Sequence, residues 1–306
     1  MNPLRIASFL PAATEMVCAL GLIDHLVGIS HECDYPIEVA KKPVVVRCAL
    51  DLEKMSLREI DQAVTQQLRQ GKSLYQIDEH ALQTAAPNLI ITQDLCQVCA
   101  PSGNEVTQVL AALKSKPEIL WQTPKSFESV LTEMLVLGEK TKTQKKAKEW
   151  VHQARQRVDR IVRKQLAART RAFFLEWVDP IYCGGHWIPT MLRWAGAEDS
   201  ISREGTDSVR IEWQQVLDWN PQVLIVSACG FGLQKNLTQA EQLKTRHGWS
   251  RLDAVRNHRV YAVNANAYFS RPGPRLVDGL ELLAHLFHPE LFPWSGADGA
   301  FAKVDP

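Results

Sequence analysis

Residues 5–21 have the sequence RIASFLPAATEMVCALG, in which a short apolar run passes directly into a helical pattern. The run Arg5–Phe9 predicts a buried strand. Pro11 fits the first turn of a helix, and Gly21 is a common residue just beyond a helix end. Because a strand followed at once by a helix is the repeating unit of α/β proteins, this stretch predicts a mostly parallel sheet.

The same alternation continues through the first half of the chain. Short apolar runs predict further strands, and apolar residues at helical spacing predict the helices between them. The expected strands are Leu26–Ser30, Val44–Arg47, Leu89–Thr92 and Ile119–Trp121, and the expected helices are Leu57–Arg69, a short one capped by Asp78, and Val106–Leu113.

The second half repeats this order of elements. Arg171–Trp177, Val223–Ser227 and Arg259–Val263 predict strands, while Ile188–Trp194 and Pro274–Leu286 predict helices. The sequence therefore predicts two similar α/β lobes with mostly parallel sheets, at residues 1–138 and 169–306.

A long amphipathic helix is expected between the lobes, over Lys142–Leu166 within the segment 139–168. Thr141 and Gln144 fit a capping box, and apolar residues recur on one face as far as Leu166. At ~1.5 Å per residue this helix is about 35–40 Å long and predicts a stiff connection. Its other face is basic, which allows nucleic-acid binding. However, that face has no aromatic residue for base stacking, and a solvated surface is the simpler interpretation.

The composition is that of a globular protein without a strong overall field. The 306 residues are 45% hydrophobic and 23% charged, with a net charge of +1. This balance gives no reason to expect a nucleic-acid or membrane partner. We find neither a transmembrane segment nor a signal peptide in the sequence. The chain has seven cysteines, an odd number, which argues against a disulfide framework. We therefore expect a cytoplasmic protein, with the periplasm as the alternative.

Unusual residues gather in the loops that follow the predicted strands. Ligands of parallel α/β sheets bind beyond the carboxyl ends of the strands, so these loops are expected to meet at a cleft that suits a large planar ligand. The candidate ligand-binding residues are Phe9, Pro11, His31, Glu32, Tyr35, Asp94, Trp177, Tyr182, His186, Trp187, Phe231, Tyr268, Phe269 and Arg271. Trp177 and Phe231 fit the core of a lobe equally well, and Arg271 with Arg275 could form an anion site.

Cysteines in the same loops raise a second hypothesis. Cys96 and Cys99 form a CxxC pair, which can bind a soft metal or cycle as a dithiol. If their loop meets that of Cys33 and His31, the four residues could coordinate zinc, iron or a cluster. The sequence contains no Ser-His-Asp order, phosphate loop or dinucleotide fingerprint. Binding is therefore expected and catalysis is not, with a metal- or thiol-dependent enzyme as the minority alternative.

Several motifs together resemble one family. LPAATEMVCALG at 10–21 and VGISHECDYP at 27–36 are similar to cobalamin-binding members of the substrate-binding proteins of ABC transporters. The resemblance continues through LEWVDP, GGHWIP, CGF and SRPGPR in the second half. It implies two α/β lobes joined by a rigid helix, known as the helical-backbone substrate-binding fold.

The resemblance also implies a function. It predicts that a corrinoid such as cobalamin, or a related metal chelate, binds between the lobes, either for an ABC permease partner or in an intracellular carrier. Two features depart from the family: no export signal or lipoprotein cysteine is found, and the chain has more cysteine and histidine than corrinoid binding requires. The second feature resembles a cysteine-bearing, often signal-less branch.

Overall fold

The computed structural model describes residues 3–52, 55–93, 113, 116–164 and 168–305. The chain divides into two compact units. The first unit comprises residues 1–124 and 129–151, and the second comprises residues 125–128 and 152–306. The three-part division at residues 138 and 168 stays a prediction.

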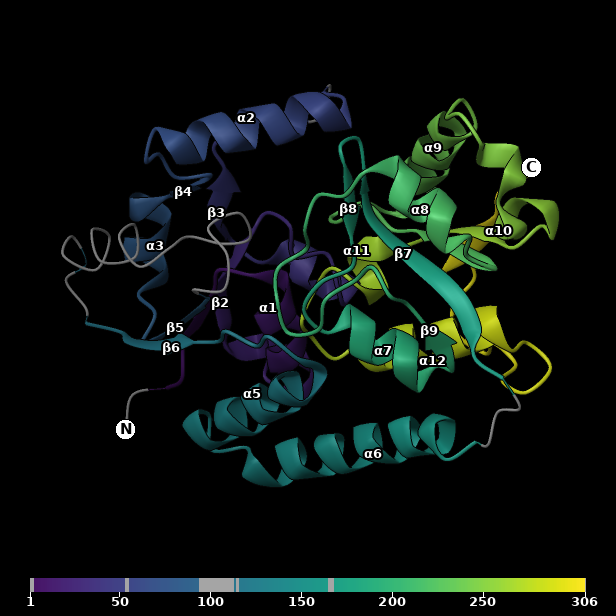
Figure 1. Cartoon of the computed structure of the whole chain (residues 1–306). Helices are drawn as coiled ribbons and strands as arrows, with labels where there is room; N and C mark the ends of the chain where they lie inside the picture. The colour runs from purple at the N-terminus through teal and green to yellow at the C-terminus, as the bar shows by residue number, and fades with distance from the viewer. Residues whose placement is uncertain (1–2, 53–54, 94–112, 114–115, 165–167, 306) are drawn as a thin grey trace. The chain divides into compact units, whose positions relative to one another are not determined.

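The first unit is built on a mostly parallel sheet, as expected. Its strands pair in parallel except at β3 and β4, which are antiparallel. The order across the sheet is β4 (Tyr75–Ile77), β3 (Val44–Cys48), β2 (Leu26–Ser30), β1 (Ile6–Ser8), β5 (Leu89–Thr92) and β6 (Glu118–Trp121). Because β2, β1 and β5 are parallel neighbours, their carboxyl ends lie side by side at one edge of the sheet (Figure 1).

Three helices of the first unit, α1, α2 and α3, begin where the sequence indicates, whereas α5 was not predicted. α1 (Pro11–Ala19) has its proline at the first helical position. Ser56 and Glu59 form a capping box at the start of α2 (Leu57–Arg69), and the Asp78 carboxylate accepts a hydrogen bond from the Ala81 N–H at the start of α3. The other described helices are α3 (Glu79–Ala85), α5 (Phe127–Lys140) and the 3-10 turns η1 (Ile23–His25) and η2 (Ile37–Lys41).

The second unit has a sheet with a parallel centre. β7, β10 and β11 are parallel, while β8 and β12 pair antiparallel at the two edges. The short strand β9 pairs in parallel with the start of β7. The order is β12 (Phe301–Lys303), β11 (Val260–Val263), β10 (Val223–Val226), β7 (Thr170–Val178) and β8 (Ile181–Cys183), with β9 at Ala197–Glu198. The α/β fold with two similar, mostly parallel sheets is confirmed.

Helices and turns lie between these strands. They are α7 (Ile188–Trp194), α8 (Trp213–Trp219), α9 (Leu233–Leu243), α10 (Asp253–Arg256), α11 (Ala265–Tyr268), α12 (Leu276–Phe287) and the 3-10 turn η3 (Trp249–Arg251). The last helix starts two residues after the expected Pro274. It packs closely on α11, since a Cβ at Gly279 would lie 2.3 Å from the Tyr268 carbonyl oxygen.

The long helix predicted from the sequence is α6 (Gln144–Val162), shorter at both ends than expected. Lys142 has φ +59°, a left-handed conformation that separates α5 from α6. The Thr141 hydroxyl donates to the Leu137 carbonyl oxygen and so belongs to the end of α5, not to a capping box of α6. The boundary between the units falls inside α6, after Val151. The restriction of lobe motion by this helix stays a prediction.

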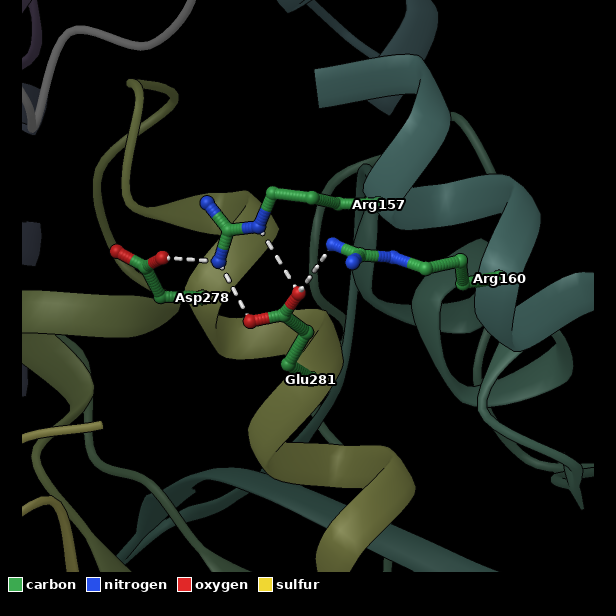
Figure 2. Close-up of polar contacts among 4 residues, drawn as sticks. All are labelled: Arg157, Arg160, Asp278 and Glu281. Carbon is green, nitrogen blue, oxygen red and sulfur yellow. Dashed lines mark hydrogen bonds and ion pairs between the residues drawn. The ribbon is translucent and has the colours of Figure 1, made fainter. Parts of the chain in front are cut away.

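Within the second unit, ion pairs connect α6 to α12. The basic face of α6 is therefore not wholly exposed to solvent. Arg157 Nε donates to Glu281 Oε1 at 2.9 Å, and its Nη2 lies 2.5 Å from both Glu281 Oε2 and Asp278 Oδ1 (Figure 2). Arg160 approaches the same Glu281 at 4.0 Å. The hydrogen bond with Glu281 raises the pKa of Arg157 above its usual range, so this guanidinium stays charged.

We expect Arg157→Met to lower the free energy of unfolding of the second unit by about 1–2 kcal/mol. The substitution keeps the apolar stem but leaves two carboxylates facing each other without their cation. The loss is moderate because the Arg157 side chain is 32% exposed and solvent screens the pair. Urea unfolding at low and high salt measures it, and the difference from wild type should shrink at high salt.

Arg163→Met on the same helix provides the matched control. Arg163 pairs with Asp159 one turn away, but its side chain is 79% exposed. We expect a loss below about 0.5 kcal/mol. Equal losses for the two variants would contradict the assignment of Arg157 as the connection between α6 and α12.

Candidate functional site

The described candidate residues of the first unit follow β1 and β2 at the carboxyl edge of its sheet, and the structure separates them into buried and exposed groups. Phe9 is fully buried in a cluster that includes Val45 and Ile90, and Pro11 is buried at the start of α1. His31, Glu32 and Tyr35 are exposed in the loop after β2. The loop after β5 contains Asp94, Cys96 and Cys99, which lie outside the described residues.

Cys33 sits in a buried polar cluster of the first unit. Its Sγ lies 3.1 Å from the Thr14 hydroxyl, which in turn donates to the Ser8 hydroxyl at 2.9 Å. The Ser8 hydroxyl donates to the Leu10 carbonyl oxygen, so the cluster ties the start of α1 to the loop after β2.

The described part of the chain shows no metal site. There, no three His, Cys, Asp or Glu side chains gather closely enough to hold a metal ion. With Cys96 and Cys99 outside that part, ligation by these two residues together with Cys33 and His31 stays a prediction.

In the second unit, two aromatic rings lie near the carboxyl ends of β7 and β10, Trp177 within β7 and Phe231 in the loop after β10. The rings of Trp177 and Phe231 have centroids 5.7 Å apart. The Trp177 indole N–H and the Ser227 hydroxyl are buried, and neither has a hydrogen-bond partner among the described residues. Buried polar groups are normally paired, so two such groups at one edge of a sheet point to a water or ligand as their partner.

Two chain segments of the second unit form a clasp that is bonded to β7. Segment 183–186 and segment 205–209 are joined by backbone hydrogen bonds, and a Cβ at Gly185 would lie 2.4 Å from the Ser208 nitrogen. Oε2 of Glu176 on β7 accepts hydrogen bonds from the Ser208 hydroxyl and, at 3.1 Å, from the Gly185 N–H. Burial raises the pKa of Glu176 to about 7.

His186 is part of the same clasp. Its backbone has φ +51°, and its Nε2 lies 3.0 Å from Asp207 Oδ1. Burial lowers the pKa of His186, although Asp207 opposes that shift. Tyr182, the remaining candidate after β7, is partly buried and pairs with Arg210 as an isolated backbone bridge.

The other candidates of the second unit are buried. The Trp187 side chain is 5% exposed, and its indole N–H donates to the Phe269 carbonyl oxygen at 2.9 Å. Tyr268, Phe269 and Arg271 are also buried. The structure thus places these residues in the interior of the second unit, and their part in ligand binding stays a prediction.

Sequence reasoning overlooked three residues at these edges. Trp121, the last residue of the partly exposed strand β6, is 40% exposed although it is a large aromatic residue. Glu176 is the one acid in the apolar strand TRAFFLEWV, and that contrast was the available signal. Ser227 carried no signal, because a serine after a strand is common in loops.

Known proteins have sequences and folds similar to those of this chain. The model of the periplasmic binding protein family matches residues 6–267. The chain belongs to this family. A Bacillus subtilis relative, named an uncharacterized ABC transporter substrate-binding lipoprotein, is 25% identical over 296 residues, covering 95% of this chain and 82% of the relative. The vitamin B12-binding protein of Vibrio cholerae is 27% identical over 284 residues, covering 90% and 86%.

Solved structures of family members have the same fold. A periplasmic heme-binding protein of Pseudomonas aeruginosa superimposes with a TM-score of 0.72 at 20% identity, covering 100% of this chain and 99% of that one. The periplasmic vitamin B12-binding protein of Vibrio cholerae gives 0.66 at 22% identity, covering 95% and 98%. The resemblance to substrate-binding proteins of ABC transporters is confirmed.

The expectation of a cytoplasmic location is wrong. The relatives are described as lipoproteins or periplasmic proteins, which points to a location outside the cytoplasm. The expectation rested on finding no signal peptide in the sequence and on the odd number of cysteines, and neither observation determines the compartment. None of the described helices combines the length and apolar character needed to cross a bilayer.

Proposed function

We propose that this family member is the substrate-binding component of an ABC importer and that its ligand is a corrinoid or haem-like metal chelate. The observation that carries the proposal is a pair of buried polar groups, Trp177 Nε1 and Ser227 Oγ, that have no hydrogen-bond partner among the described residues at the carboxyl edge of the second sheet. The Trp177 ring lies 5.7 Å from that of Phe231. Flat rings offer stacking surface to a macrocycle, and polar groups offer hydrogen bonds to its substituents.

The first unit supports the proposal independently. Tyr35 and Trp121 follow or end parallel strands of its sheet and are 49% and 40% exposed. Large aromatic side chains exposed at a sheet edge where ligands bind are typical of a recognition surface. The relatives named for vitamin B12 or heme make these two ligands the first to test. An ABC permease is the partner that the family implies.

We expect cyanocobalamin or haemin to bind one-to-one and to raise the melting temperature, since a ligand that binds only the folded state stabilises it. Titration calorimetry with cyanocobalamin, haemin and a ferric siderophore measures affinity and rank. Trp177→Phe keeps the ring but removes the N–H, and it should weaken binding about tenfold if that donor contacts the ligand.

Trp121→Ala should also weaken binding about tenfold by removing a stacking surface. Leu135→Ala, a truncation of another exposed apolar residue of the first unit, is the control and should leave affinity unchanged. If none of the three ligands binds the wild-type protein, the proposal fails.

A further inference from the structure

A hollow lies in the second unit at the edge of the sheet opposite to the aromatic loops. Its volume is about 450 Å³. Arg169 directly precedes β7, Gln222 precedes β10 and Arg259 precedes β11, so the hollow sits at the amino ends of three neighbouring parallel strands. Phe287 and His288, at the end of α12, form another wall.

Two guanidinium groups in this hollow are held in place without being neutralised. Arg169 Nη1 donates to the carbonyl oxygens of Arg193 and Ala197, at 2.9 and 3.2 Å. Arg259 Nη2 donates to those of Leu286 and Phe287, at 3.2 and 2.8 Å. Arg193, Leu286 and Phe287 lie in the last turns of α7 and α12, whose dipoles attract a cation. Carbonyl oxygens carry no formal charge, however, so both guanidiniums keep their charge and further N–H donors.

The remaining polar groups of the hollow add donors. The Gln222 Oε1 accepts from the Arg171 backbone N–H at 3.0 Å, which leaves its side-chain amide nitrogen to donate elsewhere. His288 Nε2 lies 3.4 Å from the Gly196 carbonyl oxygen. Glu290 is the one carboxylate among the lining residues, and it is exposed. Two arginines and one exposed carboxylate thus line the hollow.

We propose that this hollow is an anion site for a small organic molecule that carries at least two negative charges, as carboxylates or phosphates. Preorganised guanidiniums are well suited to both groups, because they donate paired hydrogen bonds to planar or tetrahedral oxyanions. A single water occupies about 30 Å³, so the hollow has room for a molecule larger than inorganic phosphate. The buried Phe287 gives it an apolar wall.

The site is separate from the one in the proposed function, because it lies at the amino ends of the same strands whose carboxyl ends carry Trp177 and Phe231. Its occupant therefore need not be the transported ligand. An anion bound there would join β7, β10, β11 and the end of α12, and would stabilise the second unit by linkage.

Titration calorimetry at constant ionic strength tests the proposal with citrate, glycerol 3-phosphate and acetate. Citrate or glycerol 3-phosphate should bind one-to-one with a dissociation constant of about 1 mM or lower, and acetate at least tenfold more weakly. Citrate alone would assign a carboxylate ligand, and glycerol 3-phosphate alone a phosphate. Absence of saturable binding for both, or equal binding of acetate, would overturn the site.

Variants locate the binding. Arg169→Gln and Arg259→Gln should each weaken binding about tenfold, since each removes a charged donor. Arg251→Gln removes an exposed arginine of the same unit outside the hollow and should change nothing. Equal weakening by Arg251→Gln would show unspecific attraction and refute the site.

Backbone amide shifts of the wild-type protein give a second readout if Arg259→Gln unfolds, because Arg259 also holds the end of α12. Citrate should shift the amides of residues 168–170, 222, 287, 288 and 290 most. Shifts centred on Trp177 and Phe231 instead would place the anion in the other site and overturn the inference.

Discussion

Trp187→Ala should lower the free energy of unfolding of the second unit by about 3–5 kcal/mol, the largest loss that we expect from one substitution. The indole is 5% exposed, so the change leaves a large cavity and an unpaired Phe269 carbonyl group. Domains are stable by only about 5–15 kcal/mol, and a loss of this size brings the unit near unfolding at 37 °C. Urea unfolding followed by circular dichroism measures it.

Trp187→Phe separates the cavity from the hydrogen bond. Phenylalanine retains most of the apolar volume but leaves the buried Phe269 carbonyl oxygen without its donor, which costs about 1–3 kcal/mol. The control is Trp213→Phe, which removes a similar bond to the His247 carbonyl oxygen at 2.8 Å at an exposed position. Because water can replace that donor, the control should lose less than about 1 kcal/mol. Equal losses of unfolding free energy would show that burial does not determine how much the Trp187 hydrogen bond stabilises the unit.

Trp187 also shows where sequence reasoning stopped. Its place in a loop after a strand predicted a ligand contact, and so did that of Phe9. A loop position specifies the edge of the sheet but not the direction of a side chain. Phe9 joins the core of the first unit, and the Trp187 indole donates to a residue 82 positions away. Such distant contacts leave no trace in local pattern.

The strands and helices were predicted more reliably because local patterns determine them. Apolar runs located β1, β2, β5, β7, β10 and β11, and Pro11 and Asp78 marked helix starts. β4 was not foreseen, since Tyr75–Ile77 has no apolar run and depends on pairing with β3. The extent of α6 was overestimated because the left-handed conformation of Lys142, which separates α5 from α6, has no signal in the apolar pattern.

The pKa of Glu176 likewise depends on residues that are distant in the sequence. The strand places an acid among apolar residues, but its partners, Gly185 and Ser208, come from later segments of the chain. Only their meeting in space makes the side chain a buried, hydrogen-bonded carboxyl. Its raised pKa was therefore inaccessible to sequence analysis.

This raised pKa predicts a pH-dependent stability. Burial raises the pKa of Glu176 from 4.5 to about 7, so between these values the folded state binds more protons than the unfolded state. Stability therefore falls as pH rises through this window. Below pH 4.5 both states are protonated and there is no penalty. Above pH 7 the folded state carries a buried carboxylate, at a cost of at most about 3 kcal/mol.

Glu176→Gln should remove this penalty while retaining the clasp, because a glutamine oxygen can accept from both Gly185 and Ser208. We expect the variant to match wild type at pH 4.5 and to be more stable at pH 8, by about 1–3 kcal/mol. Urea unfolding across pH 4.5–8 measures the difference. Other titrating groups of the clasp, His186 above all, are common to both proteins and cancel to first order.

Glu198→Gln, at an exposed carboxylate of the same unit, is the control and should differ from wild type by less than about 0.5 kcal/mol at every pH. The decisive quantity is how the difference in unfolding free energy between Glu176→Gln and wild type changes with pH. A constant difference from pH 4.5 to 8 would mean that Glu176 ionises at its ordinary pKa in the folded protein. The clasp would then be open enough to hydrate the carboxylate, and segment 205–209 would be held by its backbone bonds alone.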